Sequence, residues 1–181
     1  MEIREVNIDD IQKLVEIGKQ TFYETFASAN SEEDMAAYLV KGFSHEKLKS
    51  ELTDPNTLFY FAEEKGQAIG YLKINTGSAQ SEMKDENTLE IERIYVRKEH
   101  QGKKVGQLLF EKAIAVANKK NVESVWLGVW EENLKAMRFY QKNGFKAFDK
   151  HIFVLGKDEQ TDIMMKLEIN PSEPYISLLE E

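Results

Sequence analysis

A loop with two glycines and two lysines, Gln101-Gly102-Lys103-Lys104-Val105-Gly106, has the residue types that bind phosphate. Glycine lets the backbone approach an anion closely and adopt positive φ. The lysines add positive charge, and the free N–H groups at the start of a helix favour anions. The loop lacks the Gly-Lys-Ser/Thr ending of a Walker loop and the third glycine of a dinucleotide fingerprint. Taken alone, it fits a phosphate site and a tight strand-to-helix turn with solvated lysines equally well.

Two carboxylates precede this loop. Glu90 and Glu92 are two residues apart in the strand expected at 88–97, so both side chains are expected on the same side of it. Two neighbouring carboxylates can raise one another's pKa towards working pH, which suits a general base. The alternative is that one or both only form ion pairs with Arg93, Arg97 or lysines.

The composition excludes several kinds of chemistry. The chain has 181 residues and a net charge of −8, and this argues against broad nucleic-acid binding, which needs a basic face. There is no cysteine, so disulfides, thiolate metal sites and cysteine nucleophiles are excluded. The three histidines have no metal-ligand spacing and are expected to be structural or surface residues. With neither a signal peptide nor an apolar run of roughly 20 residues, a cytoplasmic protein is expected.

The apolar pattern predicts a mixed α/β domain over residues 1–170, followed by a tail over 171–181. A polar loop is expected at 76–87, a hairpin turn at Lys65-Gly66-Gln67 and a polar turn at 156–161. Asn7 or Asp9 is expected to cap the first helix, and Ser31 the second. The expected strands cover 2–6, 58–64, 68–75, 88–97, 124–130, 145–156 and 162–169, and the expected helices cover 11–26, 32–39, 46–52, 104–120 and 134–143.

The loop and its surroundings resemble the GNAT family of acyl-CoA-dependent N-acyltransferases. The signature loop of that family reads Gln/Arg-x-x-Gly-x-Gly/Ala. Gln101 and Gly106 match its ends, whereas Lys104 stands where the family has its middle glycine. A second family feature, Asn-x-x-Ala-x-x-Phe-Tyr-x-x-x-Gly-Phe, is matched completely by Asn133, Ala136, Phe139, Tyr140, Gly144 and Phe145. The resemblance implies an α/β (α+β) fold with a mixed, mostly antiparallel sheet of about seven strands. Helices would flank this sheet, and a V-shaped splay would separate strands 88–97 and 124–130.

The resemblance also implies direct transfer of an acetyl group from acetyl-CoA to a primary amine in a ternary complex, without a metal. Tyr140 would be the acid that protonates the leaving thiolate, the alternative being a half-buried core tyrosine. Glu92, or else Glu90, would be the base, with Glu92 slightly preferred because it lies nearer the splay. The implied cofactor-binding residues are Ile94, Tyr95, Val96, Gln101, Gly102, Lys103, Lys104, Val105, Gly106, Gln107, Asn133 and Lys142.

The N-terminal half of this fold usually shapes the acceptor pocket. Phe22, Tyr23, Glu24 and Trp130 are the predicted acceptor-binding residues, because carboxylates with aromatic faces suit an alkylammonium chain. This region and several strands look similar to the PaiA-type polyamine N-acetyltransferases, which implies spermidine or spermine as acceptor. An ordinary amphipathic helix pair with a solvated acidic face is the structural alternative. Another small amine or a protein N-terminus also remains open as acceptor.

Two further functions stay open for a chain of this kind. One is a non-catalytic acyl-CoA-binding regulatory module on the same fold, which the presence of Tyr140, Glu90 and Glu92 disfavours. The other is a nucleic-acid-binding regulator, against which the acidic charge counts. Small molecules, and neither nucleic acid nor membrane, are therefore the expected partners. A homodimer is possible, in which the apolar tail residues Tyr175, Ile176, Leu178 and Leu179 either form a dimer contact or cover the core of their own chain.

Overall fold

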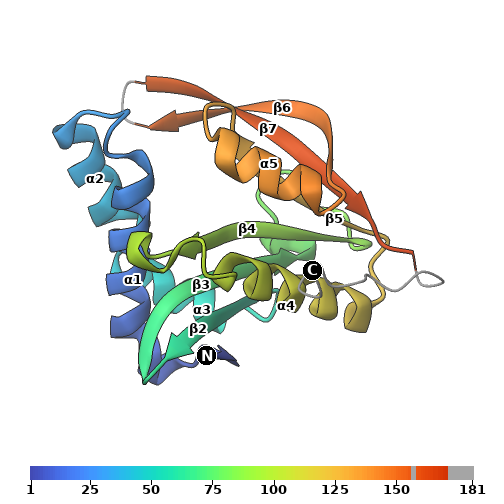
Figure 1. Cartoon of the computed structure of the whole chain (residues 1–181), viewed down its shortest axis with the longest axis horizontal. Coiled ribbons are helices and arrows are strands. Elements are labelled where there is room, and N and C mark those ends of the chain that lie inside the picture. Colours follow the sequence, from blue (N-terminus) through green and yellow to red (C-terminus); the bar gives the residue numbers. More distant parts are fainter. Residues whose placement is uncertain (156–157, 171–181) are drawn as a thin grey trace.

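The computed structural model describes residues 1–155 and 158–170, which form one mixed sheet with helices on both faces (Figure 1). The sheet has seven strands in the order β1-β2-β3-β4-β5-β7-β6, and its one parallel pair is β4 with β5. This is the predicted architecture. The strands are β1 (Glu2–Glu5), β2 (Thr57–Glu64), β3 (Gln67–Thr76), β4 (Thr88–Val96), β5 (Ser124–Trp130), β6 (Lys146–Leu155) and β7 (Asp158–Glu168).

Five α-helices accompany the sheet over residues 1–155 and 158–170. They are α1 (Ile11–Phe26), α2 (Glu32–Gly42), α3 (His45–Thr53), α4 (Val105–Lys120) and α5 (Leu134–Lys142), with short 3₁₀ turns at Ile8–Asp10, Gly77–Ala79 and Lys98–His100. Asn7 caps the first turn and Ser31 caps α2, as the sequence indicates. None of the helices over residues 1–155 and 158–170 has the length and apolar character needed to cross a membrane.

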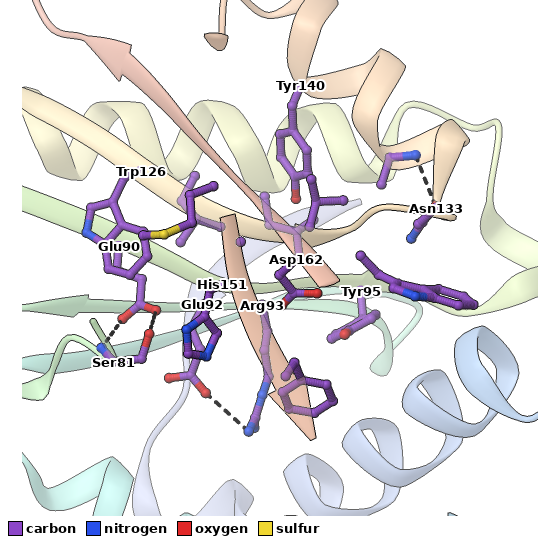
Figure 2. Close-up of a pocket in the computed structure, with 18 of the residues that line it drawn as sticks. Ser81, Glu90, Glu92, Arg93, Tyr95, Trp126, Asn133, Tyr140, His151 and Asp162 are labelled. Carbon is purple, nitrogen blue, oxygen red and sulfur yellow. Dashed lines mark hydrogen bonds and ion pairs between the residues drawn. The ribbon is translucent and has the colours of Figure 1, made fainter. Parts of the chain in front are cut away.

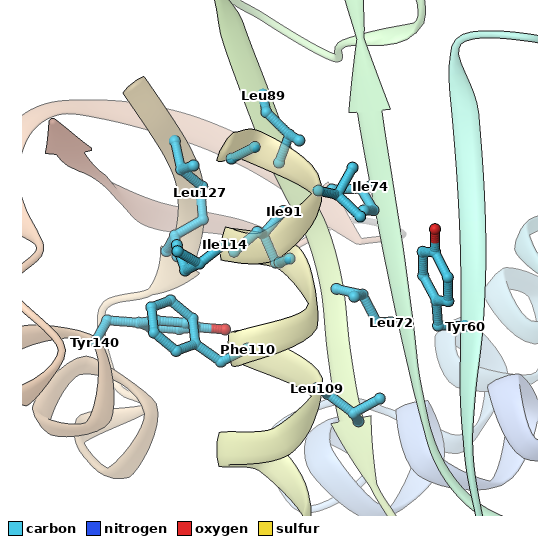
Figure 3. Close-up of a cluster of buried hydrophobic side chains, with 14 of the residues drawn as sticks. Tyr60, Leu72, Ile74, Leu89, Ile91, Leu109, Phe110, Ile114, Leu127 and Tyr140 are labelled. Atoms are coloured by element: carbon cyan, nitrogen blue, oxygen red, sulfur yellow. The ribbon is translucent and has the colours of Figure 1, made fainter. Parts of the chain in front are cut away.

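Two apolar clusters hold the layers together. On one face, α4 packs on β2, β3 and β4, and Leu109, Phe110 and Ile114 meet Leu72 and Ile91 of the sheet (Figure 3). On the other face, α1 and α3 cover the sheet through the cluster that contains Leu14, Ile17 and Phe43. The side chains of both clusters are almost fully buried. The middle strands are therefore fixed from both sides, and β4 and β5 are rigid supports for whatever lies between them.

The hairpins differ in how well the sequence predicts them. Lys65 and Gly66 both have positive φ, 51° and 77°, and form the two-residue turn expected between β2 and β3. The polar turn expected at 156–161 is wrong, because β7 begins at Asp158 and pairs Glu159, Gln160 and Thr161 with β6. Polar residues there are tolerated because the β6–β7 ladder needs only their backbone groups. The tail at 171–181 lies outside the described residues, so the domain boundary at 170 stays a prediction.

Candidate active site

The central feature of the site is the point where β4 and β5 separate. Their parallel pairing covers only Thr88 with Ser124, Leu89 with Val125 and Glu90 with Trp126, and beyond Glu90 the two strands diverge. A cavity of about 320 Å³ lies in this opening, with walls from β4, β5, β6, β7, α1 and α5 (Figure 2). The predicted splay is confirmed, and it brings residues far apart in the sequence around one space.

The open edge of β4 presents backbone groups to this space. The Arg97 N–H donates to the Ile69 carbonyl at 2.9 Å, so alternation along an antiparallel pair directs the backbone of Tyr95 towards β3 as well. By the same alternation, Ile94 and Val96 turn their N–H and C=O groups to the side where β5 has moved away. The Val96 carbonyl indeed accepts a hydrogen bond from the Gln101 side chain at 3.2 Å. These groups can pair with an extended amide-bearing ligand.

The glycine-lysine loop ends in a left-handed residue at the start of α4. Lys104 has φ 62° and ψ 7°, the conformation that a glycine adopts readily and that costs another residue roughly 1–2 kcal/mol. The lysine thus keeps the backbone shape that a glycine at this position would give. Gly102 has φ 79°, and a Cβ built on it would face open space. The loop is an exposed cradle ahead of a 16-residue helix, as an anion site requires.

Of the predicted cofactor-binding side chains, Gln101, Gln107 and Asn133 form hydrogen bonds within the protein, and Lys142 lies away from the cavity. The Gln101 amide oxygen accepts from Lys135 Nζ at 2.8 Å, and Gln107 Nε2 donates to Asn143 Oδ1 at 3.0 Å, which ties α4 to the end of α5. The Asn133 Oδ1 atom caps α5 by accepting from the Ala136 N–H, although Asn133 lines the cavity. Lys142 is exposed at the C-terminal end of α5 and does not line the cavity.

Tyr140 lies on α5 with its ring packed against Phe139 and Phe145, at centroid distances of 5.2 and 5.6 Å. It lines the cavity, and Figure 2 shows its hydroxyl pointing into it. Among the residues that the structure describes, no hydrogen-bond partner is recorded for this hydroxyl. Burial raises the pKa of the Tyr140 phenol, so the group keeps its proton at neutral pH and can donate it. A buried, protonated and unengaged hydroxyl has the properties of a general acid.

Glu90 and Glu92 do share one side of β4, and Asn75 Nδ2 donates to both carboxylates, at 3.0 and 2.6 Å. Glu90 is almost fully buried, and burial raises its pKa, with a further contribution from the charge of Glu92. Its oxygens accept hydrogen bonds from the backbone N–H and the hydroxyl of Ser81, in the loop before β4. The raised pKa expected from two neighbouring carboxylates is therefore found at Glu90, with burial as its main cause.

Glu92 behaves in the opposite way. Burial opposes its ionisation, but the charges of Arg93 and Lys73 outweigh burial and lower its pKa to about 2. Lys73 Nζ lies 2.6 Å and Arg93 Nη2 3.2 Å from the Glu92 oxygens, and Lys73 also contacts Glu51 at 3.0 Å. A carboxylate held between two buried cations is a weak proton acceptor at neutral pH. For Glu92, the ion-pairing alternative describes the structure.

A β-bulge explains why Arg93 is close enough to form this pair. Lys73 of β3 faces Arg93, and the next residue, Ile74, faces Ile91, so Glu92 is an extra residue in β4. Simple alternation would place Arg93 on the opposite side of the strand from Glu92, whereas in the structure Arg93 also lines the cavity. The sequence carries no signal of the bulge, and Arg93 was therefore missed as a residue of the site.

The predicted acceptor residues divide into two pairs. Phe22 and Trp130 line the cavity. Tyr23 is half exposed and Glu24 accepts a hydrogen bond from the Lys98 N–H at 2.9 Å, and neither of them lines it. Cavity walls that the sequence analysis did not assign come from Phe26, Tyr38, Trp126, Phe153, Ser81, Glu82, His151, Asp162 and Met164.

His151 lines the cavity, a position that the expectation of a structural or surface residue did not specify. Its Nε2 atom lies 3.2 Å from the Glu82 carboxylate, which comes from the loop before β4. Sequence reasoning had no means to bring this loop and β6 together, since their contact depends on the register of β6 with β7. No group of three or more His, Asp or Glu side chains over residues 1–155 and 158–170 is arranged to hold a metal ion.

Comparison with known proteins agrees with this geometry. The sequence model of the acetyltransferase (GNAT) family matches residues 13–145. An uncharacterised N-acetyltransferase encoded in the pepI 3′ region of Lactobacillus delbrueckii subsp. lactis is 42% identical over 92% of this chain and 96% of its own length. A spermidine N(1)-acetyltransferase of Thermoplasma acidophilum is 29% identical over 82% of this chain and 90% of its own.

A solved structure is similar over the same range. The PaiA N-acetyltransferase of Thermoplasma acidophilum, in complex with coenzyme A, superposes with a TM-score of 0.78 at 28% identity. The match covers 93% of this chain and 98% of that one. The fold therefore has a counterpart in a protein whose structure was solved with coenzyme A.

The ion pairs of Glu92 with Lys73 and Arg93 make the free energy of unfolding depend on pH. The Glu92 carboxylate titrates at about 2 in the folded protein against 4.5 for an ordinary glutamate. The stabilisation is therefore complete above about pH 4.5 and is lost as the pH falls towards about 2. Glu92→Gln should lower the free energy of unfolding at neutral pH by on the order of 3 kcal/mol, and this deficit should shrink as the pH falls through that window. Urea unfolding at a series of pH values measures it.

The same substitution at the exposed Glu33 of α2 is the control, and its unfolding free energy should follow that of the wild type. A deficit of Glu92→Gln that stays constant from pH 6 to pH 2 would contradict the ion-pair assignment.

Proposed function

The chain belongs to the acetyltransferase (GNAT) family, and from this premise we propose that it acetylates a primary amine of a polyamine such as spermidine or spermine. Family membership makes it an acetyl-CoA-dependent N-acetyltransferase. The observation that carries the polyamine proposal is the cavity between β4 and β5. Its walls are aromatic, and four of its charged side chains are carboxylates (Glu82, Glu90, Glu92 and Asp162) against Arg93 and His151.

Aromatic faces with carboxylates are the surroundings that an alkylammonium chain prefers, through cation–π contact and ion pairing. A relative that carries the name of a spermidine N(1)-acetyltransferase supports the same acceptor. A polyamine also suits a cavity that opens to solvent, since a long, flexible chain can enter it end first. The predictions of a cytoplasmic location and of a homodimer stay predictions.

The open edge of β4 and the loop after it fit acetyl-CoA, which supplies the thioester carbonyl that the amine attacks. The backbone groups of Ile94 and Val96 would pair with the amides of its pantetheine arm. The N–H groups between Gln101 and Gly106, at the start of α4, would hold its diphosphate, and Lys103 adds positive charge nearby. The exposed cradle and the left-handed Lys104 support this placement.

In the proposed reaction the amine nitrogen forms a bond to the thioester carbon, and the bond from this carbon to sulfur breaks. Tyr140 gives its hydroxyl proton to the leaving sulfur, and Glu90 accepts the proton that the nitrogen loses. The products are the N-acetylamine and the free thiol of CoA. No residue is acylated, in keeping with a chain that has no cysteine. Solvent then returns a proton to Tyr140 and removes one from Glu90.

We place Glu90 before Glu92 as base, which reverses the preference drawn from the sequence. A base needs a pKa near the working pH, and burial raises that of Glu90 whereas two cations hold that of Glu92 at about 2. Both Ser81 bonds fix the Glu90 carboxylate in place. Glu92 instead neutralises Lys73 and Arg93, so that these cations do not repel a cationic acceptor.

Release of CoA thiol from acetyl-CoA across a panel of amines tests the acceptor. Spermidine and spermine should give acetyl-CoA-dependent turnover, because their ammonium groups suit the acidic, aromatic cavity. Peptides with a free N-terminus should react more slowly. Turnover confined to peptides would overturn the polyamine proposal, and binding of acetyl-CoA without thiol release from any amine would favour a regulatory module.

Glu90→Gln tests the base through the pH profile of kcat/KM for spermidine. In the wild type the Glu90 carboxylate takes the proton of the amine, so activity should rise with pH as Glu90 ionises and then level off. In the variant only the free amine can react, so activity should be lower by about 10²- to 10⁴-fold near neutrality and keep rising with pH. Profiles of the same shape in both proteins would remove Glu90 from this role.

Tyr140→Phe should lower kcat by about 10²- to 10⁴-fold, because the leaving thiolate loses its proton donor. The dissociation constant of acetyl-CoA should change by less than about twofold, because the phenyl ring still fills its place. Since the Tyr140 hydroxyl has no hydrogen-bond partner among the described residues, the melting temperature should not fall. Tyr60→Phe, in β2 and outside the cavity, is the matched control for loss of a hydroxyl. Unchanged turnover in Tyr140→Phe would rule out Tyr140 as the acid.

A further inference from the structure

Four carboxylates line the cavity, and three of them are already neutralised or hydrogen bonded by the protein. Glu82 lies 3.2 Å from His151, Glu90 accepts from Ser81 and Asn75, and Glu92 contacts Lys73 and Arg93. The fourth, Asp162 of β7, has neither an ion pair nor a hydrogen bond recorded among the described residues. Burial raises the pKa of its carboxyl group, and the nearby His151 offsets this only in part, so the cavity holds a partly desolvated acid that no cation among the described residues contacts directly.

The surroundings of Asp162 leave room for a ligand. Its cross-strand neighbour on β5 is Trp130, and on the other side His151 of β6 lies opposite. Gly128, two residues before Trp130, would bring a Cβ to within 3.4 Å of Asp162 Oδ2, so the glycine keeps the space beside this carboxylate free. Asp162 lines the cavity together with Glu90 of β4 and Tyr140 of α5 (Figure 2). A carboxylate beside an indole and next to a glycine gap matches an alkylammonium group.

We propose that Asp162 binds the second, non-reacting ammonium group of the acceptor and so makes the enzyme selective for diamines and polyamines over monoamines. This inference rests on the proposed function. The bound ammonium is not the reacting one, because the nitrogen that attacks must lose its charge. A carboxylate that accepts no hydrogen bond from the described residues would hold that charge in place and slow the reaction. Glu90 and Tyr140 serve the reacting end, and Asp162, on the other arm of the opening, serves the remote end.

The proposal separates two contributions to binding. The aromatic walls favour any alkyl chain, whereas Asp162 acts only on an acceptor with a second positive charge. A change at Asp162 should therefore appear in KM for diamines and should leave the reaction of a monoamine unaltered. This pattern distinguishes a specificity-determining residue from a base, whose loss would lower kcat for every amine.

The experiment compares 1,4-diaminobutane and spermidine with n-butylamine as acceptors, by thiol release at saturating acetyl-CoA. Asp162→Asn should raise KM for the two polycations by about 10- to 100-fold, the effect of losing one charged hydrogen bond, and leave kcat within about twofold. The kcat/KM for n-butylamine and KM for acetyl-CoA should stay within about twofold. Asp162→Glu, which retains the charge, should recover part of the diamine preference. Asp149→Asn, an exposed carboxylate on β6, is the control of equal charge.

A thermal unfolding measurement accompanies the kinetics. Asp162→Asn should unfold at the wild-type temperature or above it, because the raised pKa of Asp162 means that its charge destabilises the fold in spite of the nearby His151. A lowered melting temperature would assign Asp162 a structural role and overturn the proposal. So would unchanged diamine kinetics, or an equal fall in kcat for all three amines. If the wild type acetylates n-butylamine but neither polycation, the proposed polyamine function is wrong. If the wild type acetylates the polycations and Asp162→Asn does so with the same KM, only the role of Asp162 is wrong.

Discussion

The site depends on one interruption of a hydrogen-bond ladder. Had β4 and β5 stayed paired beyond Glu90 and Trp126, their backbone groups would be satisfied and the space between them closed. Because they diverge, β4 has backbone groups that do not pair with β5, and residues of β5 line the cavity. Where the ladder no longer joins these strands, Ile91 of β4 and Leu127 and Val129 of β5 are still packed in one apolar cluster.

Two glutamates on one face of β4 show how neighbouring positions acquire opposite electrostatics. Glu90 is surrounded by uncharged donors, so burial dominates and its carboxylate holds a proton more readily. Glu92 is the extra residue of a bulge, which brings Arg93 and Lys73 to it, and it stays ionised. The same type of side chain thus has a raised pKa at one position and serves as a counter-ion two residues further on.

The sequence predicts the parts that local rules determine. The loop from Gln101 to Gly106, the α5 motif with Tyr140 and the positions of most strands follow from patterns within short segments. The bulge at Glu92, the return of Ser81 and Glu82 towards β4, and the position of Asp162 opposite Trp130 depend on strand register, which a single sequence does not encode locally. Tyr23 and Glu24 were assigned by residue type alone, and the helical period turns them away from the cavity.

The charges of the protein respond differently to salt. Lys103 and Lys104 stand in solvent, where mobile ions screen a charge within about 8 Å at physiological ionic strength. Lys73 and Arg93 are buried against Glu92, where such ions do not reach. Ionic strength therefore governs how fast an anionic molecule is drawn to the surface loop, while the electric field inside the cavity stays constant. The attraction of anions to the surface loop and the electric field inside the cavity therefore vary independently of each other.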